Sequence, residues 1–189
     1  MTLEELHKEL SNINALRENR LKYAQIVLND LGLLPKLITI LFIVDDKVSC
    51  KAAWVLEFVC AKYIYALVPY LDEFTSNINK VHLDSAVRPV AKVCEFLAKT
   101  YYSKQPNTIK KMLLPKHKEL IIESCFDWMI RDEKIAVKAY SMNSLYLFGK
   151  DYEWIHPELA QILEQDFPNQ SPGYKARAKH ILKKIKAKK

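Results

Sequence analysis

Apolar residues recur three and four positions apart along almost the whole chain, and this spacing predicts α-helices. Near the N-terminus the spacing holds from Leu3 to Val27. Further helices are predicted at about 35–44, 47–62, 69–79, 84–102, 117–130, 133–149, 157–166 and 172–186. No strand pattern competes with these segments. The pattern therefore predicts an all-α protein of about ten helices in short antiparallel pairs.

Short polar residues and glycine mark several of the predicted helix ends. Thr2 and Glu5 have the spacing of a capping box, in which each side chain accepts a hydrogen bond from the other's backbone amide. Gly32 is expected to end the N-terminal helical stretch, and Ser171 is expected to cap the last helix. The segment 103–116, SKQPNTIKKMLLPK, is the one long connection that the pattern predicts.

The second helix of each pair carries a recurring pattern in which a basic residue comes first, alanine or proline second, and in three of four copies alanine or serine fourth. The copies are Lys51-Ala52-Ala53-Trp54, Arg88-Pro89-Val90-Ala91, Lys138-Ala139-Tyr140-Ser141 and Lys175-Ala176-Arg177-Ala178. A short polar residue usually stands six positions earlier, within the turn of the pair. These residues are Asp45, His82, Asp132 and Asn169. The chain is therefore built from repeats.

These repeats resemble HEAT repeats, which pair two antiparallel helices with an aspartate in the turn and an arginine or lysine on the second helix. The resemblance covers about 33–186 and implies a right-handed α-solenoid of about five helix pairs. Each pair of such a stack packs on its neighbours, so the terminal pairs need polar outer faces. A single domain over 1–189 would then divide into cap helices at 1–32, repeats at 33–102, the connection at 103–116, repeats at 117–186 and a basic tail at 187–189.

In HEAT-like proteins the second helices line the concave surface, so the resemblance places a binding site there. The candidate binding residues are Lys51, Trp54, Arg88, Lys92, Lys138 and Lys175. The cations would contact carboxylates or phosphates, and Trp54 would offer an apolar platform. A structural interpretation stays open beside this one: each cation would pair with an aspartate of a neighbouring turn, and the indole would fill space in the stack.

Composition excludes several classes of function. The chain has 3 glycines in 189 residues, against a usual frequency of about 7%, and lacks the glycine-rich loops of dinucleotide and P-loop proteins. Its 5 histidines are scattered, and it contains neither a metal-ligand motif nor a nucleophile motif. The lyase signature SSxMPxKxN of the adenylosuccinate lyases has no match either. We therefore expect no cofactor, no metal and no lyase activity.

Cysteine spacing and hydropathy bear on location. The 4 cysteines lie in apolar helical stretches without CxxC spacing, which predicts buried free thiols and a reducing, cytoplasmic compartment. The longest apolar run, 31–44, is shorter than the roughly 20 residues that cross a bilayer. No secretory signal is evident. No membrane span is therefore expected.

The net charge of +7 is concentrated at the C-terminal end. Residues 1–174 carry 21 basic and 22 acidic residues, a net charge of −1, whereas 175–189 carry 8 basic residues and no acidic one. Lys179, Lys183 and Lys184 form a basic strip there. Such a strip binds nucleic acid or acidic partners, or simply keeps the end of the chain soluble.

Two classes of function remain. We favour a non-catalytic scaffold that binds a protein or peptide partner, because Glu57, Asp84 and Glu95 interleave with the central cations and weaken their attraction for phosphates. The alternative is a nucleic-acid-binding protein. The segment Cys50–Glu57, CKAAWVLE, is weakly similar to a helix of the HEAT-like alkylpurine DNA glycosylases, in which tryptophans and an acid flank the damaged nucleotide. The partner and the oligomeric state are left open.

Overall fold

The computed structural model describes residues 1–187, which contain helices and no strand. Ten of the eleven α-helices in this range form five successive pairs. The pairs are α1 (Leu3–Ser11) with α2 (Arg17–Asn29), α3 (Leu34–Leu41) with α4 (Lys47–Lys62), α5 (Leu71–Asn77) with α6 (Asp84–Tyr101), α8 (Pro115–Ile130) with α9 (Ile135–Phe148), and α10 (Ile155–Asp166) with α11 (Pro172–Lys186). The short helix α7 (Thr108–Met112) lies between the third and fourth pairs.

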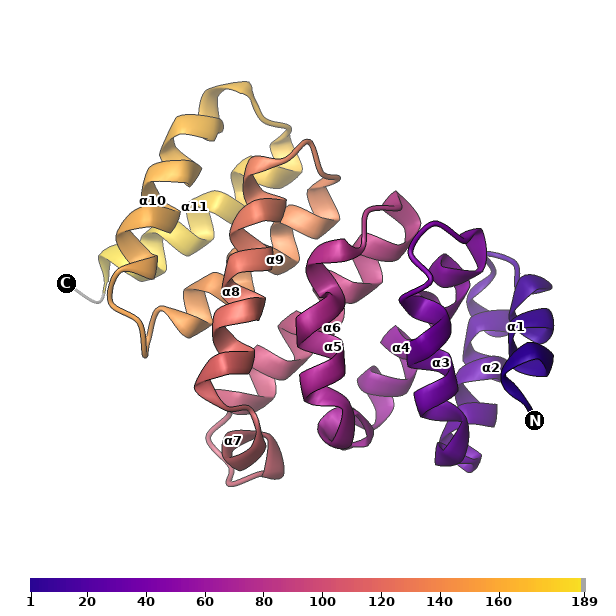
Figure 1. The fold of residues 1–189 in the computed structure, drawn as a ribbon. Helices are drawn as coiled ribbons and strands as arrows, with labels where there is room; N and C mark the ends of the chain where they lie inside the picture. Colours follow the sequence, from indigo (N-terminus) through magenta and orange to yellow (C-terminus); the bar gives the residue numbers. More distant parts are fainter. Residues whose placement is uncertain (188–189) are drawn as a thin grey trace.

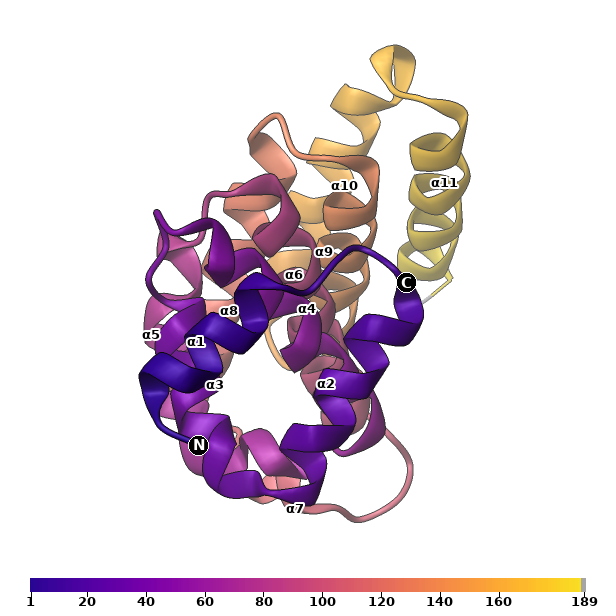
Figure 2. The same ribbon diagram turned by 90° about the vertical axis from the view of Figure 1, so that its right-hand side faces the viewer.

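The pairs stack in two layers. The second helices pack in series, α2 on α4, α4 on α6, α6 on α9 and α9 on α11, while α1 packs on α3 and α5 on α8. In Figure 1 the first helices α3, α5 and α8 lie in front of α4, α6 and α9. Figure 2 looks onto the N-terminal pair, with α1, α3, α5 and α8 to the left of α2, α4, α6 and α9. The fold is thus the all-α solenoid that the repeats predict. We call the exposed side of α2, α4, α6, α9 and α11 the second-helix face.

A continuous apolar core runs along the stack between and within the pairs. Its largest fully buried side chains come from four different helices: Phe74, Trp128, Phe148 and Tyr174. Such burial along the whole stack is expected when each pair covers its neighbour.

The four cysteines are buried and unpaired, which confirms the prediction of free thiols. Burial disfavours the thiolate and raises the pKa of Cys125 to about 12, so this residue stays a thiol at neutral pH. The reducing, cytoplasmic compartment inferred from the cysteines stays a prediction.

Several helix ends form as the sequence predicts. The Thr2 amide donates to Glu5 Oε2 over 2.8 Å, and the Glu5 amide donates to Thr2 Oγ1 over 3.2 Å, so the capping box is complete. The Ser171 hydroxyl accepts from the Tyr174 amide over 3.3 Å at the start of α11. Both caps satisfy amides that the first helical turn leaves without a backbone partner.

The prediction that Gly32 ends the N-terminal helical stretch is wrong. That stretch divides into α1 and α2, and α2 ends at Asn29. Gly32 lies in a 3-10 turn, Leu31–Leu33, with no positive φ, and its amide donates to Asp30 Oδ1 over 3.0 Å. The aspartate closes the turn with its short side chain, so the conformational freedom of glycine is not required.

Two boundaries of the middle segments also differ from the prediction. The helix expected over 69–79 begins at Leu71, because Pro69 lies inside a 3-10 helix, Ile64–Tyr70. The connection expected over 103–116 contains α7, which Asn107 caps by accepting from the Lys110 amide over 3.1 Å. Of the basic tail at 187–189, residues 188–189 lie outside the described residues.

Asp46 provides a test of how much a single cap contributes to the stack. Its side chain accepts from the Val48 amide over 2.8 Å at the start of α4 and contacts His7 Nε2 at 2.6 Å, joining the first two pairs. We expect Asp46→Ala to lower the free energy of unfolding by about 0.5–2 kcal/mol, the usual cost of losing an N-cap. Urea unfolding followed by circular dichroism measures the change. The neighbouring Asp45→Ala should cost less, since Asp45 caps no helix and is largely exposed; an equal loss would contradict the prediction.

Candidate functional site

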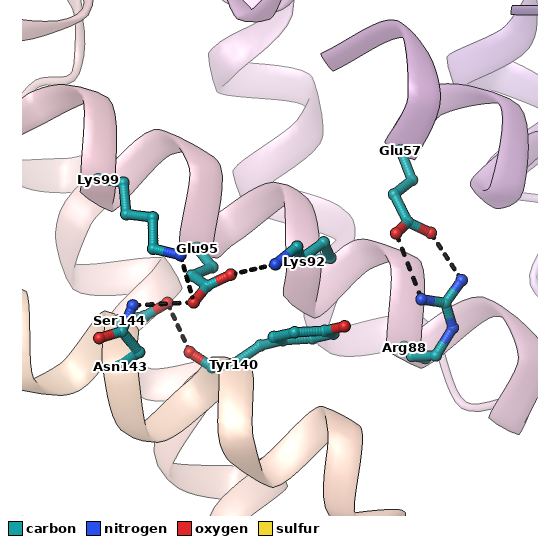
Figure 3. Close-up of polar contacts among 8 residues, drawn as sticks. All are labelled: Glu57, Arg88, Lys92, Glu95, Lys99, Tyr140, Asn143 and Ser144. Carbon is teal, nitrogen blue, oxygen red and sulfur yellow. Dashed lines mark hydrogen bonds and ion pairs between the residues drawn. The ribbon is translucent and has the colours of Figure 1, made fainter. Parts of the chain in front are cut away.

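The second-helix face carries a row of cations, and most of them contact an aromatic ring or a carboxylate. At the junction of α4 and α6, Arg88 forms a two-pronged ion pair with Glu57 (Figure 3). Arg88 Nη2 lies 2.6 Å from Glu57 Oε2, and Nη1 lies 3.3 Å from Oε1. Burial opposes the charged guanidinium, but Glu57 outweighs burial and raises the pKa of Arg88. The positive charge of Arg88 is therefore largely balanced by Glu57 within the fold.

Glu95 organises the junction of α6 and α9. Its carboxylate accepts from Lys92 Nζ over 2.6 Å and from Asn143 Nδ2 over 2.8 Å, and it lies 2.9 Å from Lys99 Nζ (Figure 3). The Glu95 side chain is only 6% exposed. Burial alone would raise its pKa, but the two lysines outweigh burial and hold the pKa below its ordinary value. Glu95 is therefore ionised and fully partnered at neutral pH.

Lys92 also lies over aromatic rings. Its Nζ is 4.2 Å from the centroid of the Tyr140 ring on α9 and 5.1 Å from that of Phe96. A cation over a ring face is attracted by the negative side of the ring quadrupole. Lys92 thus links α6 to α9 through both an ion pair and a cation–π contact.

A second group of cations lies where α2 meets α4. The Arg20 guanidinium lies 5.7 Å from the Trp54 ring centroid and 5.4 Å from that of Phe58, and Arg17 lies 5.3 Å from the Phe58 centroid. Lys51 Nζ lies 5.8 Å from the Trp54 centroid. We call these five residues the arginine–tryptophan cluster. It differs from the ion pairs around Glu95 because aromatic rings hold its cations without neutralising them.

Hydrogen bonds fix the geometry of this cluster and leave part of it unsatisfied. The Trp54 indole N–H donates to the Ser85 carbonyl over 2.8 Å at the start of α6, which holds the ring in place. Lys51 donates to the carbonyls of Ser11 and Ile13. Among the described residues, neither arginine forms an ion pair, and the buried Nε of Arg20 has no hydrogen-bond partner. Because neither arginine is paired with an acid, the cluster can accept a carboxylate or phosphate from outside the chain, although the covered Nε of Arg20 is not the atom that would bind it.

The structure brings four of the six predicted binding residues together. Lys51 and Trp54 lie in the arginine–tryptophan cluster, and Arg88 and Lys92 follow along α6. Lys138 and Lys175 do not join them.

The two remaining lysines stand apart from the other four. Lys138 is 7% exposed, so most of its side chain lies within the stack. Lys175 is turned towards its own pair, where it donates to the Pro168 carbonyl over 3.1 Å and lies over the Phe167 ring.

The proposed ladder between the repeat cations and the turn aspartates is not what forms. Arg88 pairs with a glutamate of the preceding second helix, and Lys51 and Lys175 donate to carbonyl oxygens. The turn residue Asp45 instead lies 3.3 Å from His82.

The basic strip divides between two sides of α11. Lys179 and Lys183 border a groove of about 670 Å³ between α10 and α11, which Phe167, Pro168 and Leu182 also line. Lys184 instead lies over the Tyr146 ring of α9, 5.3 Å from its centroid. The three lysines therefore do not form one continuous surface.

Neither arginine of the cluster was predicted from the sequence, because the recurring pattern begins only at the second pair. Their signal is present: Arg17 and Arg20 are three residues apart, and Trp54 and Phe58 are four apart, so each pair lies on one side of its helix. Tyr140 and Asn143 were missed as partners of α6, and only the packing of α9 on α6 reveals them.

Residues 1–187 contain no group of three or more His, Cys, Asp or Glu side chains that could hold a metal ion. In the same range no single helix is long and apolar enough to cross a membrane. Two combinations of neighbouring helical segments are long and apolar enough when taken together, but they are bent by 105° and 118°.

Comparison with known proteins gives one match. A family model described as the HEAT repeat domain matches residues 6–185, which include parts of all five helix pairs. No curated protein and no solved structure matches the chain significantly. The weaker similarity to the alkylpurine DNA glycosylases is not found in these comparisons.

Proposed function

The chain belongs to the HEAT repeat family, and from this premise we propose that it is a non-catalytic scaffold that binds an acidic segment of a partner protein on the second-helix face. Helical repeats of this kind present an extended surface to which each pair contributes. Protein interaction is the typical use of such repeats. The choice of an acidic segment rests on the cations and aromatic rings of the second-helix face.

The arginine–tryptophan cluster carries the proposal. Arg17 and Arg20 have no acidic partner among the described residues, while Trp54 and Phe58 hold them in place. A planar guanidinium binds a carboxylate through two parallel hydrogen bonds, and a neighbouring ring supports an apolar side chain of the same segment. Tryptophan and arginine are also the residues that contribute most to protein interfaces.

The distribution of charge favours a protein segment over nucleic acid. Beyond the cluster on the same face, Glu57 pairs with Arg88, and Glu95 pairs with Lys92 and Lys99. A nucleic acid requires a row of free cations that follows its backbone, and these paired cations attract its phosphates more weakly. An acidic peptide needs only one group of free cations.

A binding titration with a matched control variant tests this function. The probe is a short fluorescein-labelled peptide of glutamate and leucine, followed by anisotropy at low and moderate salt, with labelled single-stranded and duplex DNA in parallel. We expect Arg20→Gln to weaken peptide binding at least about tenfold, equivalent to about 1.4 kcal/mol. Lys22→Gln on the same helix removes the same charge from outside the cluster and should change binding less than about twofold.

Two outcomes would contradict the proposal. Equal weakening by both variants would mean that only net charge attracts the peptide. Tighter binding of either DNA than of the peptide, with a steep loss of affinity in salt, would support the nucleic-acid alternative instead.

A further inference from the structure

A pocket outside the second-helix face combines an exposed indole with unpaired carboxylates. Its volume is about 430 Å³, and it is lined by Glu119, Ile122, Glu123, Tyr152 and Trp154. The first three residues come from α8, and the other two come from the connection between α9 and α10. In Figure 1, α8, which supplies three of the lining residues, lies in the layer of first helices, in front of α9.

Trp154 is the most unusual residue of this pocket, because 53% of it is exposed. The ring of Phe126 on α8 stacks on it at a centroid distance of 5.6 Å and an interplanar angle of 22°. Phe126 thereby fixes the indole without covering all of it. Ile130, one turn further along α8, is 73% exposed. An exposed indole that a stacked ring holds in place is typical of a site of protein interaction.

The carboxylates of the pocket lack partners within the chain. Glu119 and Glu123 are exposed, lie one turn apart on α8, and form no ion pair among the described residues. Like charges at this spacing repel each other. The neighbouring Lys118 forms an ion pair with neither glutamate: its Nζ lies 3.0 Å from Asp151, 3.1 Å from the Tyr101 hydroxyl and 5.4 Å from the centroid of the Tyr152 ring. The pocket therefore keeps its negative charge beside an exposed indole.

We propose that this pocket binds a lysine or arginine side chain from a basic segment of a second partner protein. The cationic end would lie between the indole of Trp154 and the carboxylates of Glu119 and Glu123, and the aliphatic stem would pack on Ile122 and Tyr152. Charge complementarity selects this occupant, because an acidic or purely apolar segment would leave both carboxylates without a partner. The protein would then hold an acidic partner on one layer and a basic partner on the other.

A basic peptide and two charge-matched double variants test this site. The probe is a short fluorescein-labelled peptide of arginine and leucine, titrated with the full chain and followed by anisotropy. We expect Glu119→Gln/Glu123→Gln to weaken binding at least tenfold. Glu18→Gln/Glu73→Gln removes the same charge from exposed positions elsewhere and should change binding less than twofold. Trp154→Ala should weaken binding at least fivefold, because the peptide loses the ring.

Folding controls keep the outcome interpretable. The Glu119→Gln/Glu123→Gln variant should melt at the same or a higher temperature than the parent chain, since it removes a repulsion. If both double variants weakened binding equally, net charge alone would explain the attraction, and the proposal would be overturned. Arg20→Gln should leave this peptide's affinity unchanged, so failure of the acidic-segment site and failure of this pocket are distinguishable.

The occupant itself is tested by measuring mass in solution. Light scattering after size-exclusion chromatography should give the same mass for the parent chain and for Glu119→Gln/Glu123→Gln across a range of protein concentrations. A concentration-dependent dimer that this variant abolishes would overturn the choice of partner, because the pocket would then bind the basic α11 of a second copy.

Discussion

Replacement of Glu95 by alanine is expected to lower the free energy of unfolding by about 1–3 kcal/mol. Glu95 is the common acceptor for Lys92 and Lys99 on its own helix and for Asn143 on α9. Without it, two cations and an amide at the α6–α9 junction lose their acceptor. The lysines are partly exposed and regain some hydration, which keeps the cost below that of a fully buried pair.

Urea unfolding followed by circular dichroism measures this effect. Glu123→Ala is the control, because Glu123 lies in the middle of a helix, is exposed and has no ion-pair partner among the described residues. We expect the control to change stability by less than about 0.5 kcal/mol. Equal effects of the two substitutions would mean that the contacts of Glu95 add no more to the free energy of unfolding than an exposed glutamate does.

The effect of Glu95 should also depend on pH in a definite direction. Folding lowers the pKa of this carboxyl, so the folded state binds its proton more weakly than the unfolded state does. The resulting stabilisation is fully present above the ordinary glutamate pKa of about 4.3 and is lost as the pH falls through the lowered folded-state pKa. The stability difference between the parent chain and Glu95→Gln should therefore be larger at pH 7 than at pH 3. A constant difference between these pH values would contradict the assignment.

The second large effect is expected at Gly149, where α9 ends. A Cβ added there would lie 2.9 Å from Cγ of His156 and closer still to Cδ2 and Nε2 of the same ring. That ring has little room to move, since it stacks on Tyr146 at 5.5 Å and its Nε2 lies 2.9 Å from the Tyr146 carbonyl oxygen. Gly149→Ala should therefore destabilise the protein by about 1–3 kcal/mol, the usual cost of overpacking.

Thermal and urea unfolding of four variants, Gly149→Ala, His156→Ala, the combination of the two and Gly173→Ala, test this explanation. Gly173→Ala is the matched control, because its added Cβ would meet only Ile135 Cγ2 at an ordinary 3.9 Å. It should be neutral or slightly stabilising. In Gly149→Ala/His156→Ala the clash is absent, so the two substitutions together should cost less than the sum of their separate effects. Strict additivity would show that the ring is not what excludes a side chain at position 149.

Helix positions could be predicted from the sequence because they depend on local features. The capping residues Thr2 and Ser171 act within a few positions of themselves, and the apolar spacing of 47–62 is complete within one helix. The role of Gly32 was predicted wrongly for a related reason. Asp30 supplies an alternative local closure of the turn, and glycine alone does not show which of the two closes it.

The partners of the binding residues could not be predicted in the same way. The repeat pattern identified Lys51 and Arg88 as equivalent positions, and the structure places both on the second-helix face. Their contacts differ because each depends on the preceding pair: Arg88 meets Glu57, whereas Lys51 meets backbone carbonyls. Such contacts connect residues more than 30 positions apart. Which group lies opposite each cation depends on how one helix packs on the next.

The nearest-neighbour packing of the stack has a mechanical consequence. The first three pairs meet the last two mainly where α6 packs on α9 and α5 packs on α8. A change in the angle of this junction would move the two ends of the stack relative to each other. The arginine–tryptophan cluster lies in the first two pairs, and the Trp154 pocket lies in the last two pairs, beyond the junction. Bending at the junction would therefore change the distance between the two surfaces while the contacts within each surface stay the same.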